Sequence, residues 1–363
     1  MAMVTKIPIR NLYYLLSYAW GRLPEDKEPA YVQALRGSDT VELLARLLAS
    51  GVRHAVRQGL NRDYLPRAEE IPGIRGRLQF AESIRRMSFE RGRALCEYDE
   101  LDYNNLPNRI IKTTLETLFY SQSFQAMKHE RGLEDEVVLA LKLLDRIESV
   151  ELHPALFHRI RLHRGNAHYG MLLSICELAF DCLLPERDES GRRFKNFVQD
   201  QRLMAGLFED FVRNFYDWHA RPLGYTKISA AKVDWIATCE NDLSAAALPE
   251  MRTDITLESS ARKIIVDCKF YEHALDGGRY DGRKLHSGNL YQIIAYVNNR
   301  RRVIGWENCE GLLLYPAVEE EFNYAYNMDG NRIAAATVNL DRPWEKIHER
   351  LLELIGKPQT AQT

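Results

Sequence analysis

The sequence predicts a two-domain α+β protein, and three observations support this fold class. The chain has 363 residues, about twice the usual length of one domain. Its first half mixes amphipathic helices with short strands, whereas its second half alternates helices and strands. A polar stretch at 185–196, "PERDESGRRFKN", is typical of a linker or an exposed loop. We therefore expect an N-terminal α+β domain over 1–165 and a C-terminal α/β domain over 166–363.

The first half begins with two helices. "IRNLYYLLSYAW" and "TVELLARLLASGVRHAVRQGL" each place their leucines on one helical face. At 69–80, "EEIPGIRGRLQF" interrupts short apolar alternation with proline and glycine, which indicates strands joined by tight turns. A helical pattern then covers 108–147, and "HYGMLLSICELAFDCLL" at 168–184 forms another helix. This half is therefore predicted to be mixed α and β.

The second half predicts a sheet covered by helices. "QDQRLMAGLFEDFVRNFYDWHA" has a helical period, and "LPEMRTDITLESSARKIIVDCKFYEH" at 248–273 forms a hairpin of mainly apolar strands. "SGNLYQIIAYVNNR" is a helix that we expect Ser287 to cap, "GLLLYPAV" is a short buried strand, and "RPWEKIHERLLELIG" is a final helix. Alternation of this kind places helices on both faces of one sheet.

Composition and charge exclude several function classes. The chain is 45% apolar and 28% charged, as globular proteins are, and no run of 18 apolar residues or cleavable leader occurs. We therefore expect a soluble, cytoplasmic protein. A net charge of -2 gives no global attraction to nucleic acid, so DNA contact requires local patches or a partner. The six cysteines lack CxxC spacing and are expected to be reduced core residues.

The hairpin contains three charged residues among apolar ones: Asp254, Asp267 and Lys269. A tight, even-numbered turn at its centre places Asp254 directly opposite Asp267. Side chains alternate along a strand, so Asp267 and Lys269 point to the same face. Opposed carboxylates destabilise a sheet unless a positive charge compensates for them. The hairpin is therefore a candidate functional site.

Its chemistry favours a divalent cation. Lys269 supplies one positive charge, whereas Mg²⁺ or Mn²⁺ would satisfy both acids through the oxygen ligands that these ions prefer. Such a cation activates water for attack on a phosphodiester and stabilises the charge that develops. In the next helix, Gln292 and Tyr296 share a face and could orient the lysine. The alternative is a structural ion pair of Asp267 and Lys269, with Asp254 facing water.

Together these residues resemble the PD-(D/E)xK nuclease superfamily, which has an acid on one strand, D-x-K on the next and, in its RecB-like branch, Q-x-x-x-Y on the following helix. Five segments over nearly the whole chain resemble, in order, the McrC family, the nuclease subunits of McrBC modification-dependent restriction systems. They are "IPIRNLYYLLSYAW", "IPGIRGRLQF", "NRIIKTTL", "LPEMRTDI" and "NLYQIIAYV". The resemblance implies a restriction-endonuclease-like domain over 166–363. It implies that the catalytic residues are Asp254, Asp267, Lys269, Gln292 and Tyr296.

The resemblance also implies a metal site and a partner. Asp254 and Asp267 would bind Mg²⁺ or Mn²⁺, and Glu209 in "LFEDFV" matches a helix position where related nucleases place a further acid. The alternative for Glu209 is a solvated helix face. McrC-like subunits work with McrB, a GTP-hydrolysing AAA+ motor that reads modified cytosine in DNA; the N-terminal half docks into the motor ring and stimulates its GTPase. The chain lacks G-x-x-x-x-G-K-[ST], so GTP would bind to the partner.

Local basic residues are candidates for binding DNA and the partner. Arg279, Arg283 and Lys284 lie between the D-x-K strand and the following helix, where they could hold a DNA backbone. Arg75 and Arg77 in "IPGIRGRLQF" share a predicted strand face and could reach the motor or merely cover apolar surface. Two alternative functions remain, a non-catalytic adaptor of an AAA+ ring and a self-sufficient RecB-like nuclease.

Overall fold

The computed structural model describes residues 7–21, 40–127, 129, 132–162, 166, 169–184, 193–194, 197–271, 275–277, 283–317 and 321–356. The chain forms two compact units, one of residues Met1–Thr40 with Asn196–Thr363 and one of residues Val41–Lys195. The mixture of helices and sheets confirms the predicted α+β composition. No helix in the described ranges is long and apolar enough to span a membrane.

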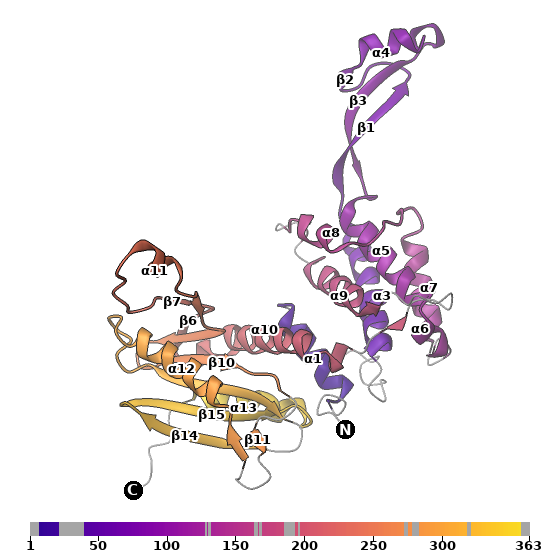
Figure 1. Ribbon diagram of the computed structural model, residues 1–363. Coiled ribbons are helices and arrows are strands. Elements are labelled where there is room, and N and C mark those ends of the chain that lie inside the picture. The colour runs from indigo at the N-terminus through magenta and orange to yellow at the C-terminus, as the bar shows by residue number, and fades with distance from the viewer. Residues whose placement is uncertain are drawn as a thin grey trace. The chain divides into compact units, whose positions relative to one another are not determined.

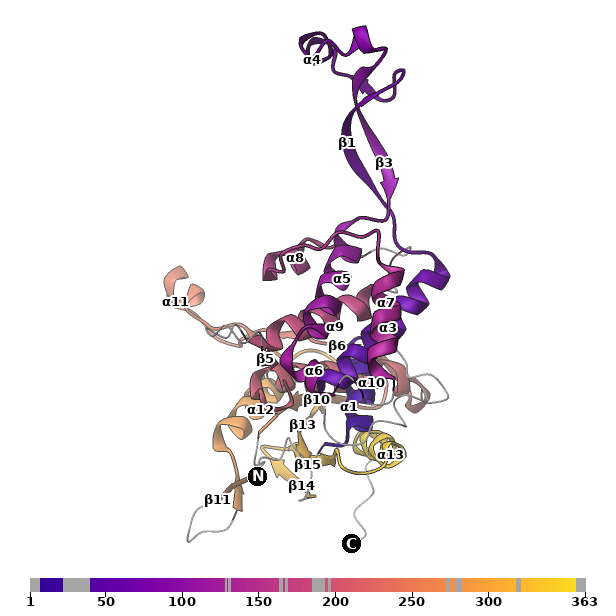
Figure 2. The ribbon, with the colours of Figure 1, turned by 90° about the vertical axis from the view of Figure 1, so that its right-hand side faces the viewer.

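The middle unit combines a helical body with a long two-stranded ribbon (Figure 1). Its elements are α3 (Thr40–Gln58), β1 (Asp63–Ile71), β2 (Arg77–Leu78), α4 (Phe80–Arg85), η2 (Phe89–Arg91), β3 (Ala94–Asp102), α5 (Leu106–Phe119), α6 (Gln122–Met127), α7 (Leu133–Leu143), α8 (Pro154–Arg159), α9 (Tyr169–Cys182), β4 (Leu183–Leu184) and β5 (Arg193–Phe194). β1 pairs with β3 along its full length, and β2 pairs with the other edge of β3. We call β1, β2, α4, η2 and β3 the arm; it leads away from the helical body (Figure 2).

The sequence predicts one helical stretch over 108–147, but the described residues of this range fall in three separate helices, α5, α6 and α7. Asn105 caps α5 by accepting a hydrogen bond from the Asn108 N–H. Ser121 accepts from the Phe124 N–H as α6 begins. Gly132 then adopts a φ of +71° immediately before α7, a conformation that glycine tolerates best.

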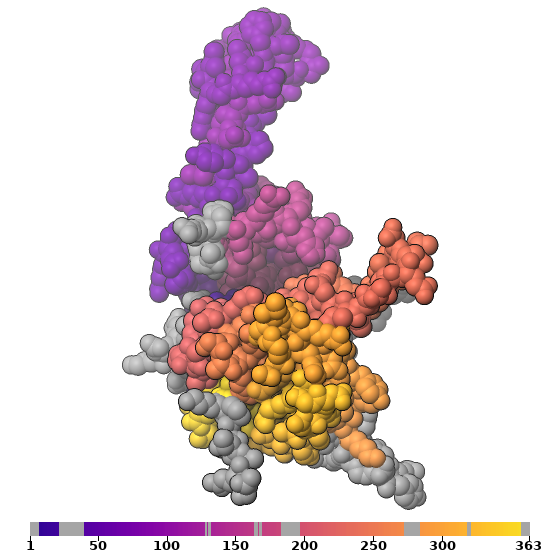
Figure 3. Space-filling view, turned by 90° about the vertical axis from the view of Figure 1, so that its left-hand side faces the viewer, coloured from indigo at the N-terminus to yellow at the C-terminus, as the bar shows by residue number. Residues whose placement is uncertain are grey.

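The other unit contains a mixed six-stranded sheet (Figure 1). Its elements are α1 (Ile9–Ala19), η3 (Phe197–Gln199), α10 (Gln201–His219), η4 (Arg221–Leu223), β6 (Tyr225–Ser229), β7 (Lys232–Val233), α11 (Asp242–Ala246), β8 (Met251–Arg252), β9 (Ile255–Ser259), β10 (Lys263–Cys268), β11 (Leu275–Gly277), β12 (Arg283–Leu285), α12 (Ser287–Arg300), β13 (Glu310–Ala317), β14 (Asn323–Met328), β15 (Asn331–Asn339) and α13 (Trp344–Ile355). The strand order is β14, β15, β13, β10, β9, β6, with β10 at the centre and parallel to β13. α11 lies at the end of an exposed excursion between β7 and β8 (Figure 3).

Helices pack on both faces of this sheet, as the sequence predicts. Ile293 and Val297 of α12 join Ile265 of β10 in one buried cluster. On the opposite face, Phe208 of α10 contacts Phe270, which follows β10, with the ring centroids 6.1 Å apart. Because side chains alternate along a strand, Asp267 and Lys269 share the α12 face with Ile265.

The observed division differs from the predicted boundary between 165 and 166. α1 packs on α10, and its Asn11 side chain donates hydrogen bonds of 2.7 and 2.8 Å to the carbonyls of Leu340 and Arg342, which precede α13. Tyr14 also stacks on Trp344 with a centroid separation of 4.4 Å. Conversely, α9 packs on α5 in the middle unit. The predicted linker at 185–196 lies outside the described residues except for β5.

Four of the cysteines are buried, as expected of core residues, namely Cys96, Cys176, Cys182 and Cys309. Cys239 and Cys268 are partly exposed.

At α12 the predicted helix cap is wrong. Ser287 is the first helical residue, and His286 occupies the capping position without a side-chain hydrogen bond.

Candidate active site

The β9–β10 hairpin has the register that its sequence predicts. Lys263 lies opposite Glu258, and Val266 lies opposite Ile255, so the next pair outward is Asp254 and Asp267. Asp254 immediately precedes β9, and its Oδ2 accepts a hydrogen bond of 2.7 Å from the Cys268 N–H. The hairpin therefore holds the two acids next to one another at the end of the central strand.

Asp267 is a fully buried carboxylate with unfilled acceptor capacity. Its exposed fraction is 0%, and neither oxygen accepts a hydrogen bond from the residues that the structure describes. The Lys269 Nζ lies 2.8 Å from Oδ2, which makes an ion pair but not a well-directed hydrogen bond. Burial raises the pKa of Asp267, although the Lys269 ammonium opposes this shift. Burial and the charge of Asp267 together raise the pKa of Asp254 to about 6.

Lys269 is oriented by a chain of hydrogen bonds from α12. Its Nζ donates to Gln292 Oε1 at 2.9 Å, and Gln292 Nε2 donates to the Tyr296 hydroxyl at 2.8 Å. Burial disfavours the ammonium, but the neighbouring Asp267 carboxylate outweighs it, so the pKa of Lys269 is raised. The lysine is therefore charged at neutral pH. The structure thus brings together all five residues for which the sequence predicts catalysis.

Glu209 also lies near the acid pair. Burial raises its pKa, and the negative charge of Asp254 raises it further. Its Oε1 is 3.0 Å from Nη1 of Arg213, one turn along α10. The sequence analysis missed Arg213, although its spacing of four residues from Glu209 is the signal that predicts an ion pair on a helix.

A second network that the sequence analysis missed supports the helix that carries Gln292. Asn289, one turn earlier in α12, is buried. Its side-chain amide donates to the Tyr315 hydroxyl at 3.1 Å, and its Oδ1 accepts from the Tyr271 hydroxyl at 3.3 Å. These bonds tie the first turn of α12 to β13 and to the chain that follows Lys269. They fix the position from which Gln292 reaches the lysine.

Two of the three residues predicted to bind DNA lie in β12. Arg279 is outside the described residues, Arg283 is in β12, and Lys284 is an exposed residue of the same strand. Arg75 and Arg77 belong to the arm of the middle unit. They do not share a strand face as predicted, because β2 begins only at Arg77.

The acid pair suits a small divalent cation. Asp267 is buried and Asp254 is partly buried, and both have raised pKa values. Neither Asp267 oxygen accepts a well-directed hydrogen bond from the described residues, so the pair provides hard ligands that lack a full counter-charge. Within the described ranges, no three His, Cys, Asp or Glu side chains converge closely enough to hold a metal. A set of two acids still fits Mg²⁺, because this ion commonly keeps several waters and takes few carboxylate ligands.

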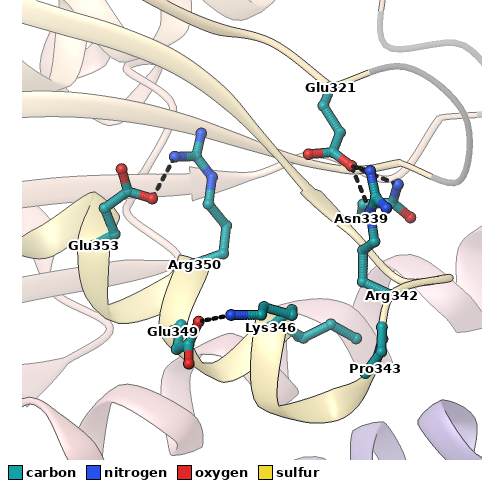
Figure 4. Close-up of a pocket in the computed structure, with 9 residues that line it drawn as sticks. Glu321, Asn339, Arg342, Pro343, Lys346, Glu349, Arg350 and Glu353 are labelled. Atoms are coloured by element: carbon teal, nitrogen blue, oxygen red, sulfur yellow. Dashed lines mark hydrogen bonds and ion pairs between the residues drawn. The ribbon is translucent and has the colours of Figure 1, made fainter.

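A cavity of about 600 Å³ in the same unit has a different character (Figure 4). Its lining comes from α13 and from the ends of β14 and β15, with charges that neutralise one another. Lys346 lies 2.7 Å from Glu349, Arg350 lies 2.8 Å from Glu353, and Arg342 lies 2.9 Å from Glu321. Because these cations are already paired, the cavity is a weaker candidate for chemistry than the acid pair.

Comparison with known proteins identifies the family. The family model for the McrBC 5-methylcytosine restriction system component matches residues 6–316. The chain is 34% identical over 354 residues to the type IV methyl-directed restriction enzyme EcoKMcrBC of Escherichia coli strain K12, covering 97% of this chain and 98% of that protein. Its fold is similar to that of a chain in the refined half-complex from the tetradecameric assembly of Thermococcus gammatolerans McrB AAA+ hexamers with bound McrC. The TM-score is 0.55 and the sequence identity is 18%, and the match covers 96% of this chain and 76% of that one. The chain therefore belongs to the family of McrBC 5-methylcytosine restriction system components, as its sequence segments predict.

Proposed function

We propose that this chain is the Mg²⁺-dependent endonuclease subunit of a modification-dependent restriction complex, with a PD-(D/E)xK nuclease fold in the unit that contains the six-stranded sheet. It would cleave DNA phosphodiesters when assembled with a McrB-like AAA+ motor, and it would stimulate the GTPase of that motor. The observation that carries the proposal is the juxtaposition of Asp254, Asp267 and Lys269, with Lys269 held by Gln292.

Each residue of the site would have a distinct role in phosphodiester hydrolysis. Asp254 and Asp267 would hold the cation, and Mn²⁺ is the natural substitute for Mg²⁺ at such oxygen ligands. When bound, the cation supplies Lewis-acid stabilisation and activates water. Lys269 carries a positive charge at neutral pH, so it stabilises negative charge on a phosphate oxygen rather than accepting a proton. Gln292 keeps the ammonium directed at the acids.

The DNA would be held beside this site by local positive charge. Arg279, Arg283 and Lys284 lie in the segment between Lys269 and α12, and Lys284 is exposed. Leu285, the next residue, packs against the buried cluster that contains Tyr296. β12 is thereby anchored to the helix of the site. Phosphate contacts from this strand would position a backbone without reading its sequence.

The arm is the surface that we propose for docking on the motor, which would bind the GTP. Its outer part, residues 74–89, exposes a group of large apolar side chains: Ile74 (71%), Phe80 (59%), Ile84 (54%), Met87 (60%) and Phe89 (42%). Exposed apolar groups of this kind mark protein interaction sites. The Arg75 guanidinium lies 4.1 Å from the Tyr98 ring centroid and 3.7 Å from Glu100, so it also stiffens the arm. Arg77 is exposed on β2.

The test is cleavage of methylated plasmid DNA with Mg²⁺ and GTP, with and without the McrB-like motor. The variants are the wild type, Asp267→Asn and a control, Asp217→Asn, which changes an exposed acid of α10. We expect cleavage by the wild type and the control only when the motor is present, and none by Asp267→Asn. All three should stimulate GTP hydrolysis.

Three outcomes would contradict this proposal. Cleavage by Asp267→Asn at the wild-type rate would remove the acid pair from the chemistry. Stimulation of GTP hydrolysis without cleavage by any of the three proteins would instead support a non-catalytic adaptor. Cleavage by the wild type alone, without the motor, would favour a self-sufficient nuclease.

A further inference from the structure

Arg213 binds the acid that completes the negatively charged cluster. It lies on α10 one turn after Glu209, and its Nη1 is 3.0 Å from Glu209 Oε1. Its Nη2 pairs with Asp210, so one guanidinium joins two neighbouring acids of the same helix. The side chains of Arg213 and Glu209 are 29% and 36% exposed, which leaves both of them room to move.

The cluster has more acids than bases. Glu209, Asp254 and Asp267 act on one another electrostatically, because Asp254 raises the pKa of Glu209 and Glu209 raises that of Asp267. Lys269 and Arg213 are the cations whose charge favours ionisation of Asp254. In the protein without metal, these two side chains therefore compensate in part for three carboxylates.

The contact with Arg213 also determines which acids are available to a cation. Among the described residues, no three acids converge closely enough to bind one metal. The Glu209 carboxylate instead forms an ion pair with the Arg213 guanidinium. A guanidinium and a metal ion compete for the same carboxylate lone pairs. We propose that Arg213 is a positioning residue. Its guanidinium holds Glu209 away from Asp254 and Asp267, and release of Glu209 from the guanidinium raises the affinity of the site for the metal. This inference rests on the proposed metal site.

The competition fixes the direction of the effects. Removing the guanidinium leaves Glu209 free to join the cation, so Arg213→Ala should bind Mn²⁺ more tightly. Breaking a partly exposed ion pair of this kind corresponds to a change of roughly two- to fivefold in affinity. The same variant should melt at a lower temperature in a chelator, because three carboxylates lose one of their counter-charges. Added metal should then restore its melting temperature.

The experiment is a calorimetric titration of the full chain with Mn²⁺, combined with melting curves in EDTA. The variants are Arg213→Ala, Arg213→Lys, Glu209→Gln and the double variant Arg213→Ala/Glu209→Gln. Arg221→Ala is the control, because Arg221, at the start of η4, forms an i,i+4 pair of 3.4 Å with Asp217 of α10. Arg213→Lys keeps the positive charge and serves as the second test if Arg213→Ala does not fold.

We expect tighter Mn²⁺ binding by Arg213→Ala, a smaller gain for Arg213→Lys and no change for Arg221→Ala. Glu209→Gln should weaken binding, and the double variant should match Glu209→Gln alone, because the gain acts through Glu209. Unchanged or weaker binding by Arg213→Ala would overturn the inference, as would a gain that persists in the double variant. Failure of the metal site itself is distinguishable: the wild type would then bind Mn²⁺ no better than Asp267→Asn.

Discussion

Asp254 is electrostatically unfavourable in the metal-free protein. Burial and the neighbouring Asp267 raise its pKa to about 6, so the folded state holds the Asp254 proton more tightly than the unfolded chain. Stability from this group is fully present below the unfolded pKa of about 4 and is lost as the pH rises to about 6. Above that pH, the site retains charge repulsion that a cation would relieve.

We predict that Asp254→Asn stabilises the metal-free protein while abolishing cleavage. The asparagine Oδ1 can still accept the Cys268 N–H, so only the charge is removed. In EDTA at pH 7 we expect a gain of about 1–3 kcal/mol in the free energy of unfolding, vanishing below about pH 4. Denaturant unfolding across this pH range measures the difference. A variant less stable than wild type at pH 7 would show that Asp254 is not electrostatically strained.

The hydrogen bonds of Gln292 predict an unequal pair of effects on cleavage. Gln292→Ala removes the acceptor that orients Lys269, and loss of such positioning should lower the rate about 10- to 100-fold. Tyr296→Phe removes only the acceptor for Gln292 Nε2, a bond worth about 1 kcal/mol, so its loss should stay below about tenfold. Single-turnover cleavage with the motor measures both. Equal effects would mean that Gln292 does not act through Lys269.

Sequence patterns predicted these residues because the relevant spacings are local. A hairpin fixes its own register, so Asp254 and Asp267 could be paired by counting from the turn. Gln292 and Tyr296 are one helical turn apart, and they do interact. The Asn289 contacts with Tyr271 and Tyr315 depend on tertiary packing of α12 against β13, for which the sequence has no comparable spacing rule.

At the scale of elements, the unexpected feature is the position of α1. Its apolar period predicted a helix, but no local signal specified that the helix packs with elements more than 180 residues later. Two of the contacts responsible are long-range hydrogen bonds, from Asn11 to the carbonyl of Leu340 and from the Asn214 side chain to that of Tyr18. The compact units therefore differ from the predicted division, in which chain order assigns α1 to the first half.

We predict that Asn11→Ala destabilises the unit that contains the six-stranded sheet. Asn11 is 5% exposed, and its loss leaves the carbonyls of Leu340 and Arg342 without this donor, at a cost of about 1–3 kcal/mol. Denaturant unfolding monitored by tryptophan fluorescence should detect the change, because Trp344 stacks on Tyr14, which lies in α1 with Asn11. Arg10→Ala, which alters an exposed residue of α1, is the control and should be neutral. Equal stability of the two variants would contradict the proposed anchoring role.

At the scale of the whole molecule, the two units are expected to carry separable functions. The acid pair and its hydrogen bonds lie entirely in the unit with the six-stranded sheet, and the exposed apolar residues of the arm lie entirely in the other. Substitutions in one unit should therefore affect one activity directly. DNA cleavage should depend on both activities because it requires the assembled complex.

This separation gives the last prediction. Ile74→Glu places a charge among the exposed apolar residues of the arm, where Ile74 is 71% exposed, so it should weaken motor binding and GTPase stimulation at least tenfold. Tyr64→Glu is the matched control, because Tyr64 is also 71% exposed. Tyr64 lies at the start of β1, whereas Ile74 follows the end of that strand. Both variants should bind Mn²⁺ as the wild type does, since neither touches the acid pair. Asp267→Asn should show the reverse pattern, with GTPase stimulation intact and Mn²⁺ binding lost. If Ile74→Glu stimulates the motor normally, the outer arm is not the docking surface, and the interface must be sought on the helical body of the same unit.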